Sequence, residues 1–306
     1  MPLFFAEKLS NFSILTPRNL LAGVGAAACW GIATVLSKGA LAFFPPLTLL
    51  VVQLLCSNVL LWSLVRIQQV PLPSPRQMLR LGLPGLIQPG LSFTLGLIGL
   101  SLTSASVEAL IWSTETLFII GLAWWMLGER VSVAIASLAS LAVVGVVLVN
   151  AAGTEAAESS LLGNLLIFAA TFCAAPYTVL IRRSAPQTNP LLLVALNQAI
   201  GLVGVLAIWL VSFRWQAPLS SPDSWHIWLL AALSGILLHG LPFWLHTIVL
   251  QSLPAGLAGL FLPLVPLFTI GGATLFLNEQ LSSAQWIGAG LILAAMTAIS
   301  RLAPAN

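Results

Sequence analysis

The sequence predicts an all-α integral membrane protein of ten transmembrane helices, arranged as two inverted-topology repeats of five helices each. Hydrophobic residues make up 59% of the 306 residues and charged residues only 6%, whereas a soluble domain carries about 25% charged residues. The apolar residues form about ten continuous stretches, each close to the roughly 20 residues that a helix needs to cross a bilayer. The sequence also matches itself when it is shifted by 150 positions.

The expected spans are separated by short connections rich in proline, none of which is long enough to hold a soluble domain. The apolar runs are continuous rather than alternating, which argues against the strands of an outer-membrane barrel. We expect residues 1–18 to form a cytoplasmic segment, residues 19–151 the first repeat and residues 161–301 the second. The ten expected spans are Asn19–Leu41, Pro45–Val65, Met78–Leu100, Ser104–Leu127, Val131–Ala151, Leu161–Ile181, Leu191–Phe213, Trp225–Val249, Ala255–Leu277 and Ser282–Ile299.

Lysine and arginine residues are concentrated in alternate connections. With the N-terminus inside, only Lys38 and Arg214 fall on the outer side. Because cytoplasmic loops retain basic residues, this bias predicts a multi-pass protein of the cell membrane with both termini in the cytoplasm. The basic residues stand singly between apolar runs, so we expect no nucleic-acid partner despite the pI of about 9.1. The inner residues are Lys8, Arg18, Arg66, Arg76, Arg80, Arg130, Arg182, Arg183 and Arg301.

The internal match runs without a gap from Gly85 on Gly235 to Ser132 on Ser282. Because each repeat holds an odd number of spans, the second copy must enter the membrane from the opposite side, about a pseudo-two-fold axis in the membrane plane. This symmetry predicts alternating access to a substrate site near the midplane, between the halves. The matches include Gly85 on Gly235, Phe93 on Phe243 and Glu129 on Glu279, and at a slightly shorter offset Thr34 on Thr178 and Lys38 opposite Arg182.

Two acidic residues lie inside the fourth expected span. Glu108 and Glu115 are seven residues apart, which on a continuous helix places them about 10 Å apart and within about 20° of one face. A carboxylate in hydrocarbon costs about 2.5 kcal/mol or more, so each must face a cavity, meet a partner or carry a proton. The functional interpretation is a cation site or a proton-coupling carboxylate, and the alternative is a neutral structural glutamate.

Other polar and aromatic side chains inside the spans are candidates for the same cavity. They can bind substrate or relay protons, or they can simply hydrogen-bond or pack between helices. Residues seven apart, such as His239 and His246, cannot ligate one metal ion, and the three cysteines lack metal-type spacing, so we expect no metal and no cofactor. The substrate-binding or ion-binding candidates are Glu115, Glu108, Trp112, His239, Gln53, Asn197, Gln198, Trp30, Tyr177 and Trp244.

Prolines interrupt several spans, and each removes a helix hydrogen bond and introduces a kink. In the third and eighth spans, which are repeat partners, proline stands near glycine, so these positions are candidate hinges for a rocking motion. A static kink is the alternative. Glu129 and Glu279 sit at helix junctions and are interpreted as structural, because a carboxylate just before a helix stabilises its N-terminal dipole. The hinge candidates are Pro89, Gly90, Gly240, Pro242 and Pro263.

The first span and two helix junctions carry distinctive motifs. These are Ala28-Cys29-Trp30-Gly31 followed by Lys38, Leu127-Gly128-Glu129-Arg130 with its echo Leu277-Asn278-Glu279-Gln280, and Pro263 in the ninth span. Together they resemble the EamA family of the drug/metabolite transporter superfamily. The chain departs from that pattern at Ala174, where a tryptophan is expected, and at Ser113, the first-half counterpart of Pro263. The resemblance implies ten helices, cytoplasmic termini and secondary transport or export of a small metabolite.

These observations predict a secondary transporter that exports an amino-acid-like or amphipathic organic compound by alternating access, with coupling to protons left open. An intramembrane enzyme is one alternative, but we find no His-Glu-x-x-His, no Gly-x-Ser-x-Gly and no intramembrane aspartate pair, and we therefore expect no enzymatic activity. A structural membrane subunit without transport activity is the other. The expected partners are the substrate, the lipid bilayer and, in a homodimer, a second copy; a monomer is equally compatible with the sequence.

Overall fold

The computed structural model describes residues 16–127, 160–212, 224–253, 255–279 and 281–302, with isolated positions between 134 and 148. These residues are helical almost throughout and include no strand. In this part of the chain seven helical segments are long and apolar enough to cross a membrane, and two shorter apolar helices follow them. The chain is therefore a multi-pass membrane protein. Most of the expected span Val131–Ala151 lies outside the described residues, as does Glu129.

The helices of each half follow one another in the same pattern. The first half contains α2 (Pro17–Ala40), α3 (Pro46–Ile67), α4 (Pro75–Gly82), the 3-10 turn η1 (Leu83–Leu86), the π-helical turn η2 (Ile87–Leu91), α5 (Ser92–Ser101), α6 (Ala105–Trp112) and α7 (Glu115–Leu127). The second half contains α9 (Leu161–Ser184), the short turn η4 (Ala185–Gln187), α10 (Pro190–Ser212), α11 (Trp225–Gly235), the π-helical turn η6 (Ile236–Gly240), α12 (Leu241–Ser252), α13 (Ala255–Ala258), the 3-10 turn η7 (Gly259–Leu264), α14 (Val265–Phe276) and α15 (Ser283–Leu302).

Helices of the two halves begin at equivalent positions of the repeat. The Thr16 hydroxyl accepts a hydrogen bond from the N–H of Asn19 at 3.3 Å and caps α2. Its repeat partner Ser160 accepts from the N–H of Gly163 at 2.9 Å and caps α9. Such hydroxyls satisfy N–H groups that the first helical turn leaves unpaired. The shorter offset of the internal match also aligns the first residues of α3 and α10, and the offset of 150 aligns those of α4 with α11 and α7 with α14, so the sequence repeat is also a structural repeat.

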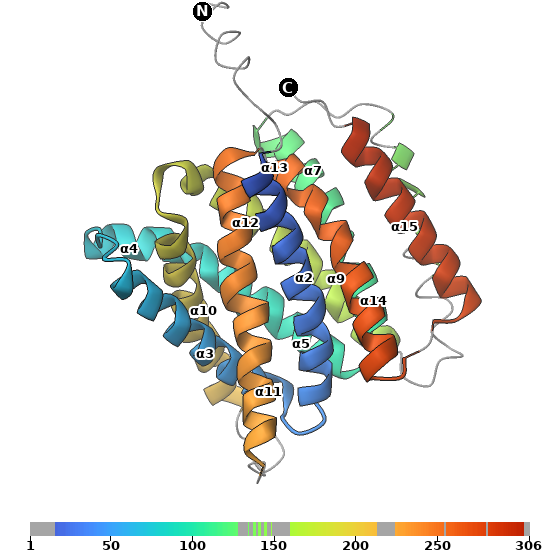
Figure 1. Cartoon of the computed structure of the whole chain (residues 1–306), viewed down its shortest axis with the longest axis horizontal. Helices are drawn as coiled ribbons and strands as arrows, with labels where there is room; N and C mark the ends of the chain where they lie inside the picture. The colour runs from blue at the N-terminus through green and yellow to red at the C-terminus, as the bar shows by residue number, and fades with distance from the viewer. Residues whose placement is uncertain are drawn as a thin grey trace, which may run out of the picture.

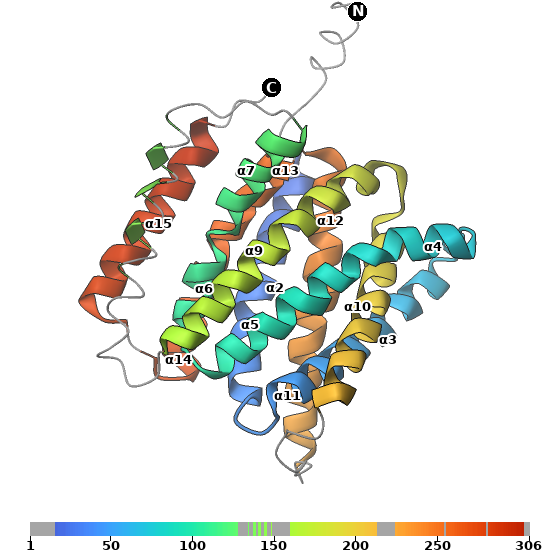
Figure 2. The same ribbon diagram turned by 180° about the vertical axis from the view of Figure 1, so that it is seen from behind.

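The two halves are interleaved rather than placed side by side. Helix α2 packs against α11, α12 and α14 of the second half, and its partner α9 packs against α5, α6 and α7 of the first half. Helices α3 and α10 pack on each other. In Figures 1 and 2 partner helices run in opposite directions, so that α2 descends from its first residue whereas α9 ascends. Most of these contacts correspond between the halves: α2 with α12 and α14 is equivalent to α9 with α5 and α7.

Two repeat-equivalent glycines set the closest of these crossings. Gly85 lies directly against the backbone of Asn197, and Gly235 lies in the same way against the backbone of Gln53. A Cβ atom at either glycine would overlap the backbone of the facing helix. Small residues allow helices inside a membrane to approach this closely. The two halves therefore contact each other at two equivalent glycine notches, Gly85 against Asn197 and Gly235 against Gln53.

A basic side chain closes a helix end in each half. Lys38 Nζ donates to the carbonyl oxygens of Leu100 at 3.2 Å and Thr103 at 2.6 Å. Arg182, its repeat partner, donates from Nη1 to the carbonyl oxygen of Leu250 at 2.7 Å. A cation at a helix C-terminus satisfies unpaired carbonyls and complements the helix dipole. Because α2 and α9 run in opposite directions, the two closures lie at opposite ends of the bundle.

Glu279 stabilises a different helix from the one predicted. Its carboxylate accepts hydrogen bonds from the N–H of Ala105 at 2.7 Å and from the N–H and hydroxyl of Ser106 at 2.9 and 2.8 Å. It therefore caps α6, which belongs to the other half of the chain. The next helix, α15, is capped instead by Ser282, whose Oγ accepts from the N–H of Gln285 at 3.3 Å. The carboxylate therefore stabilises the N-terminus of a helix, as predicted, but the helix is α6 and not α15.

The third and eighth spans are both interrupted by a π-helical turn. In the third span η2 contains Pro89 and Gly90, and Gln88 has extended backbone angles there (φ −142°, ψ 120°). In the eighth span η6 ends at Gly240, two residues before Pro242 in α12. Turns of this kind concentrate at functional sites in helices. Four hinge candidates thus lie at helix interruptions, and their motion stays a prediction.

The fourth and ninth spans are interrupted as well, again in the same register. Helix α6 ends at Trp112 and α7 begins at Glu115. In the ninth span η7, which contains the hinge candidate Pro263, ends at Leu264, and α14 begins at Val265. Both spans therefore change their helical geometry inside the molecule, at equivalent positions of the repeat.

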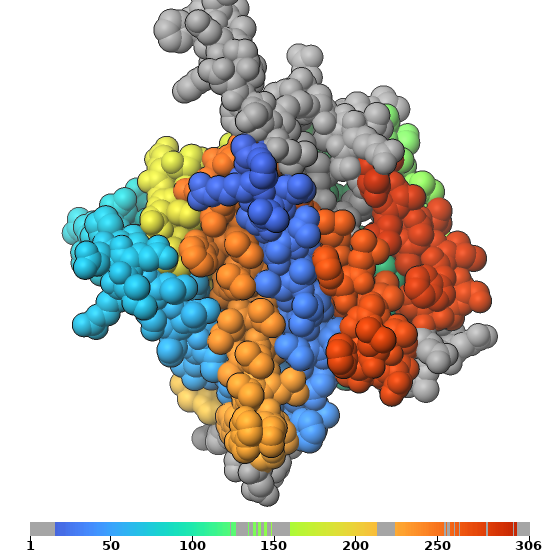
Figure 3. Space-filling model, viewed as in Figure 1, coloured from blue at the N-terminus to red at the C-terminus, as the bar shows by residue number. Residues whose placement is uncertain are grey.

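The outer surface of the bundle is apolar. Figure 3 shows α2, α12 and α14 packed side by side on one face, and large hydrophobic side chains are exposed there and elsewhere. Trp125 is 75% exposed, and Leu275 and Phe276 are 77% and 78% exposed. Exposure on this scale would be unfavourable in water, and it identifies surface that faces lipid.

The glycine notches can be tested by adding one methyl group. We expect Gly85→Ala and Gly235→Ala each to lower the free energy of unfolding by about 2 kcal/mol, because the facing backbone must move away. Gly271→Ala is the matched control, since nothing lies within 4 Å of its added carbon. Thermal unfolding of the purified protein in detergent, followed by tryptophan fluorescence, measures the difference. Equal midpoints for all three variants would show that the crossings tolerate separation.

The contact of Glu279 with α6 predicts a loss of stability when its charge is removed. Glu279→Gln should lower the free energy of unfolding by about 1–2 kcal/mol, because α6 loses charge-assisted hydrogen bonds at its N-terminus. Ser106→Ala removes only one of these bonds and should cost less. The same thermal measurement ranks the two variants, and the reverse order would contradict the capping role.

Candidate functional site

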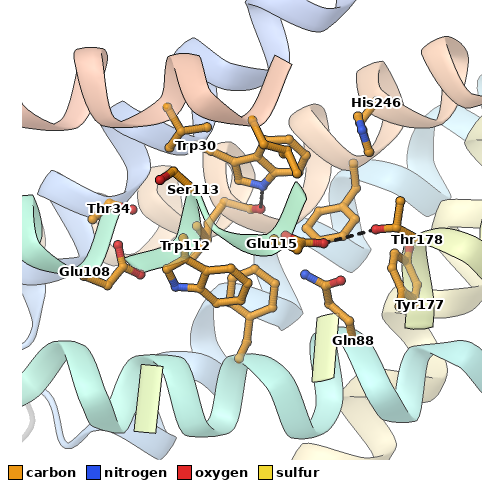
Figure 4. A pocket seen from close by; sticks show the side chains of 15 residues that line it. Trp30, Thr34, Gln88, Glu108, Trp112, Ser113, Glu115, Tyr177, Thr178 and His246 are labelled. Atoms are coloured by element: carbon orange, nitrogen blue, oxygen red, sulfur yellow. Dashed lines mark hydrogen bonds between the residues drawn. The ribbon is translucent and has the colours of Figure 1, made fainter. Parts of the chain in front are cut away.

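A pocket lies between the two halves, where the interrupted helices meet. The non-atom space inside it, part of which is open to solvent, is about 610 Å³. Figure 4 shows its polar side chains converging from several helices. The lining consists of Trp30, Thr34, Gln88, Phe93, Glu108, Trp112, Ser113, Glu115, Tyr177, Thr178, Leu238, Phe243, His246, Leu262 and Val265.

Repeat partners face one another across this pocket. Most of the lining falls into pairs that the internal register relates, so the pocket lies on the pseudo-two-fold axis. The pairs are Thr34 and Thr178, Gln88 and Leu238, Phe93 and Phe243, Trp112 and Leu262, and Glu115 and Val265. In three of them the first half supplies a polar or amphipathic side chain and the second half an aliphatic one.

Glu115 lies at the pocket just after a two-residue turn in the fourth span. Two turn residues follow α6, and Glu115 is the first residue of α7. Its carboxyl is 6% exposed, and its Oε1 accepts a hydrogen bond from the Thr178 hydroxyl at 3.2 Å, as drawn in Figure 4. The N-terminus of α7 carries the positive end of the helix dipole, which stabilises a negative charge at this position.

Glu108 occupies the other end of the pocket. It belongs to α6, whereas Glu115 is the first residue of α7. Its carboxyl is 8% exposed and lies within hydrogen-bonding reach of Thr34 and Trp112. Both carboxyls nevertheless reach one cavity, as Figure 4 shows.

Aromatic rings form much of the wall between the two carboxyls. Phe243 lies at the centre: its ring contacts Trp30 edge to face at 5.4 Å, Phe93 at 5.9 Å and Tyr177 at 5.9 Å. Trp112 stacks on Phe93 at 5.6 Å. Such a wall offers ring faces to an apolar or cationic ligand.

Trp30 connects this wall to the interruption of the eighth span. Pro242 has no N–H, so the carbonyl of Leu238 loses its usual partner four residues later. The indole N–H of Trp30 donates to that carbonyl oxygen at 3.1 Å. A pocket side chain of α2 therefore satisfies the backbone group that the proline leaves unpaired.

Half of the predicted site residues line the pocket, and half lie elsewhere. Glu115, Glu108, Trp112, Trp30 and Tyr177 are in the lining. His246, which the sequence ranked below His239, is in the lining as well. Outside it, His239 is fully buried against the ring of Phe93 at 4.5 Å, and Trp244 is half-buried in the core; the other three residues are amides, Gln53, Asn197 and Gln198.

The three amides lie at the helix crossings. Gln53 Nε2 donates to the hydroxyls of Ser37 at 2.9 Å and Ser234 at 2.8 Å. Asn197 Nδ2 donates to backbone carbonyls, the shorter bond being 2.6 Å to Leu193. Gln198 is fully buried, and among the described residues its amide has no hydrogen-bond partner. The placement of Gln53 and Asn197 fits interhelix bonding.

Several lining residues were not among the predicted ones. Thr34, Gln88, Phe93, Thr178 and Phe243 do not stand out by charge in an apolar sequence. The signal that could have found them is the internal match, because Phe93 with Phe243 and Thr34 with Thr178 are identities between the halves. Identity at such positions is expected where both copies face a common axis.

No group of three or more His, Cys, Asp or Glu side chains that could hold a metal ion occurs within the described parts of the chain. The chemistry of the lining is instead that of a noncovalent binding site: two carboxyls, hydroxyls, an amide and aromatic faces.

Comparison with known proteins agrees with this architecture. Residues 18–151 and 161–301 each match the model of the EamA-like transporter family. The uncharacterized transporter YvbV of Bacillus subtilis (strain 168) is 28% identical over 278 residues, which are 89% of this chain and 88% of that protein. A solved crystal structure is similar with a TM-score of 0.70, covering 93% of this chain and 97% of that chain. At 20% identity it bears on the fold alone.

The bond from Trp30 to the carbonyl of Leu238 predicts a specific defect. Trp30→Phe keeps an aromatic ring but removes the N–H donor, so a buried carbonyl loses its partner and the free energy of unfolding should fall by about 1–2 kcal/mol. Trp124→Phe is the control, because Trp124 is 57% exposed on the outer surface. Thermal unfolding in detergent measures both. A midpoint for Trp30→Phe as high as that of the control would contradict the role.

Proposed function

The chain belongs to the EamA-like transporter family, and on this premise we propose that it is a secondary transporter that exports a small amphipathic organic compound by alternating access. It is a membrane transporter by its family and by its transporter relative. The cargo, the outward direction and the mechanism belong to the proposal. The direction is carried over from the family resemblance of the duplicated junction motifs.

The observation that carries this proposal is the position of the pocket on the repeat axis. A site at that place can be reached from either side of the membrane by equivalent motions of two interleaved halves. Helix interruptions at the pocket supply places where such motions can occur, at η2 and η6 and at the ends of α6 and η7. The end closures by Lys38 and Arg182 would then open in turn.

We propose ten membrane spans in inverted repeats, bounded as residues 19–151 and 161–301, with both termini in the cytoplasm of the cell. The opposite directions of partner helices support the inversion. The first residue of α2 and the last residue of α15 lie at the same end of the bundle, as an even number of spans requires. The end of α9, with Arg182 and Arg183, lies there too, which agrees with the charge bias.

Glu115 is proposed as the residue that couples binding to transport. A carboxyl group at the midplane must exchange one partner for another when the cargo leaves, and a proton is the simplest replacement. Its position at the start of α7 joins the carboxyl directly to a half-helix. Binding or release of cargo or a proton at Glu115 would therefore act directly on α7.

Flux across proteoliposomes tests the transport function. With a panel of labelled amines, amino acids and neutral amphipaths, we expect at least one compound to show saturable flux and exchange against unlabelled compound. Glu115→Gln should reduce that flux about tenfold or more, because the binding charge is lost. Glu155→Gln makes the same chemical change in a predicted connection and should leave flux intact.

Two outcomes would contradict the carrier. Flux that rises linearly with concentration, without exchange, would indicate a channel. Absence of flux for the whole panel, with protein of normal thermal stability, would favour a structural subunit.

A further inference from the structure

We infer that the pocket is a site for a protonated organic amine with an aromatic or branched apolar body, rather than for an amino acid or an organic acid. This inference rests on the site of the proposed transporter and specifies its substrate class. Three features of the lining carry it: its charge, its unpaired polar atoms and its division into a polar and an apolar side.

The lining contains two carboxyl groups and, among the described residues, no lysine or arginine. Glu108 and Glu115 both reach the cavity. The two basic residues near the C-terminal ends of α2 and α9, Lys38 and Arg182, are directed to backbone carbonyls at the ends of other helices. A ligand carboxylate would therefore meet two carboxyls and no cation, whereas an ammonium group would be complementary to them.

Two buried polar atoms in the lining have no hydrogen-bond partner among the described residues. Tyr177 Oη and His246 Nε2 make no hydrogen bond with any described residue, although their side chains are only 4% and 6% exposed. A buried polar atom without a partner is unfavourable. Both atoms can accept a hydrogen bond from an N–H group, and Glu115 can accept another. An ammonium group offers such donors in several directions.

The two sides of the pocket differ in character. Gln88, Trp112 and Glu115 come from the first half, and their partners Leu238, Leu262 and Val265 come from the second. At these three positions the second half has aliphatic side chains where the first half has polar or amphipathic ones. A ligand with one charged end and one apolar end matches this division, and the rings of Phe93 and Phe243 lie at the boundary. A doubly polar ligand such as an amino acid would place a polar group against the aliphatic side.

Equilibrium binding to the purified protein in detergent tests the assignment without requiring transport. Four matched probes differ only in their polar group: 2-phenylethylamine, 2-phenylethanol, phenylacetate and phenylalanine. We expect 2-phenylethylamine to bind about tenfold more tightly than each of the others. Glu115→Gln should weaken its binding about tenfold and leave 2-phenylethanol unchanged. Glu115→Asp, which keeps the charge, should preserve the preference for the amine, and Glu155→Gln should bind as the unaltered protein does.

Several results would overturn the inference. Phenylalanine or phenylacetate binding as tightly as the amine would show that the site accepts carboxylates. The inference would also be wrong if 2-phenylethanol bound as tightly as the amine, or if Glu115→Gln left amine binding unchanged. It would equally be wrong if no probe showed saturable binding at millimolar concentration. Flux of other compounds combined with no amine preference would leave the transporter standing and remove only the substrate class. Amine binding that depends on Glu115 without any flux would remove the transporter and leave the site.

Discussion

A chain that crosses a bilayer has to satisfy its backbone hydrogen bonds within itself, because hydrocarbon offers no partner. The broken spans of this protein depend on how each interruption meets that constraint. Where Pro242 leaves the carbonyl of Leu238 without a partner, the indole of Trp30 supplies one from another helix. Where α6 begins, at the start of the fourth span, Glu279 caps it from the opposite half. The interruptions persist because side chains distant in sequence complete them.

The same satisfied interruptions bring the functional groups together. Glu115 stands at the start of a half-helix, and the rings around Phe243 fill the space between the halves. The pocket is lined by repeat-equivalent positions, but its polar groups come from positions at which the two halves differ. Glu115 is the repeat partner of Val265, and Gln88 is the repeat partner of Leu238. The lining contains only two carboxyl groups among the described residues, and the low polarity around them strengthens each electrostatic contact that they make.

Much of the fold could be predicted from the sequence, because hydropathy and self-similarity are properties of the chain itself. Span lengths followed from the bilayer thickness, and the register predicted that Lys38 and Arg182 would be equivalent. The site was predictable only where a residue is costly in hydrocarbon, as Glu108 and Glu115 are. Gln88 and Thr178 carry no such cost, and the partners of Glu279 depend on how two halves pack. Which of two histidines reaches the pocket depends on the π-helical turn beside His239, which has no clear sequence signature.

Interleaving has a consequence for biosynthesis. The ribosome completes the first half before Asn197 exists, so the notch at Gly85 stays unfilled while α9 and α10 are still being made. Helix α2 likewise lacks α11, α12 and α14, its principal neighbours, until the second half is inserted. The first half alone therefore has no complete core, and its early helices must wait in the membrane, in contact with lipid or with the insertion machinery. The first helices to be made therefore reach their final packing only when the last helices have been inserted.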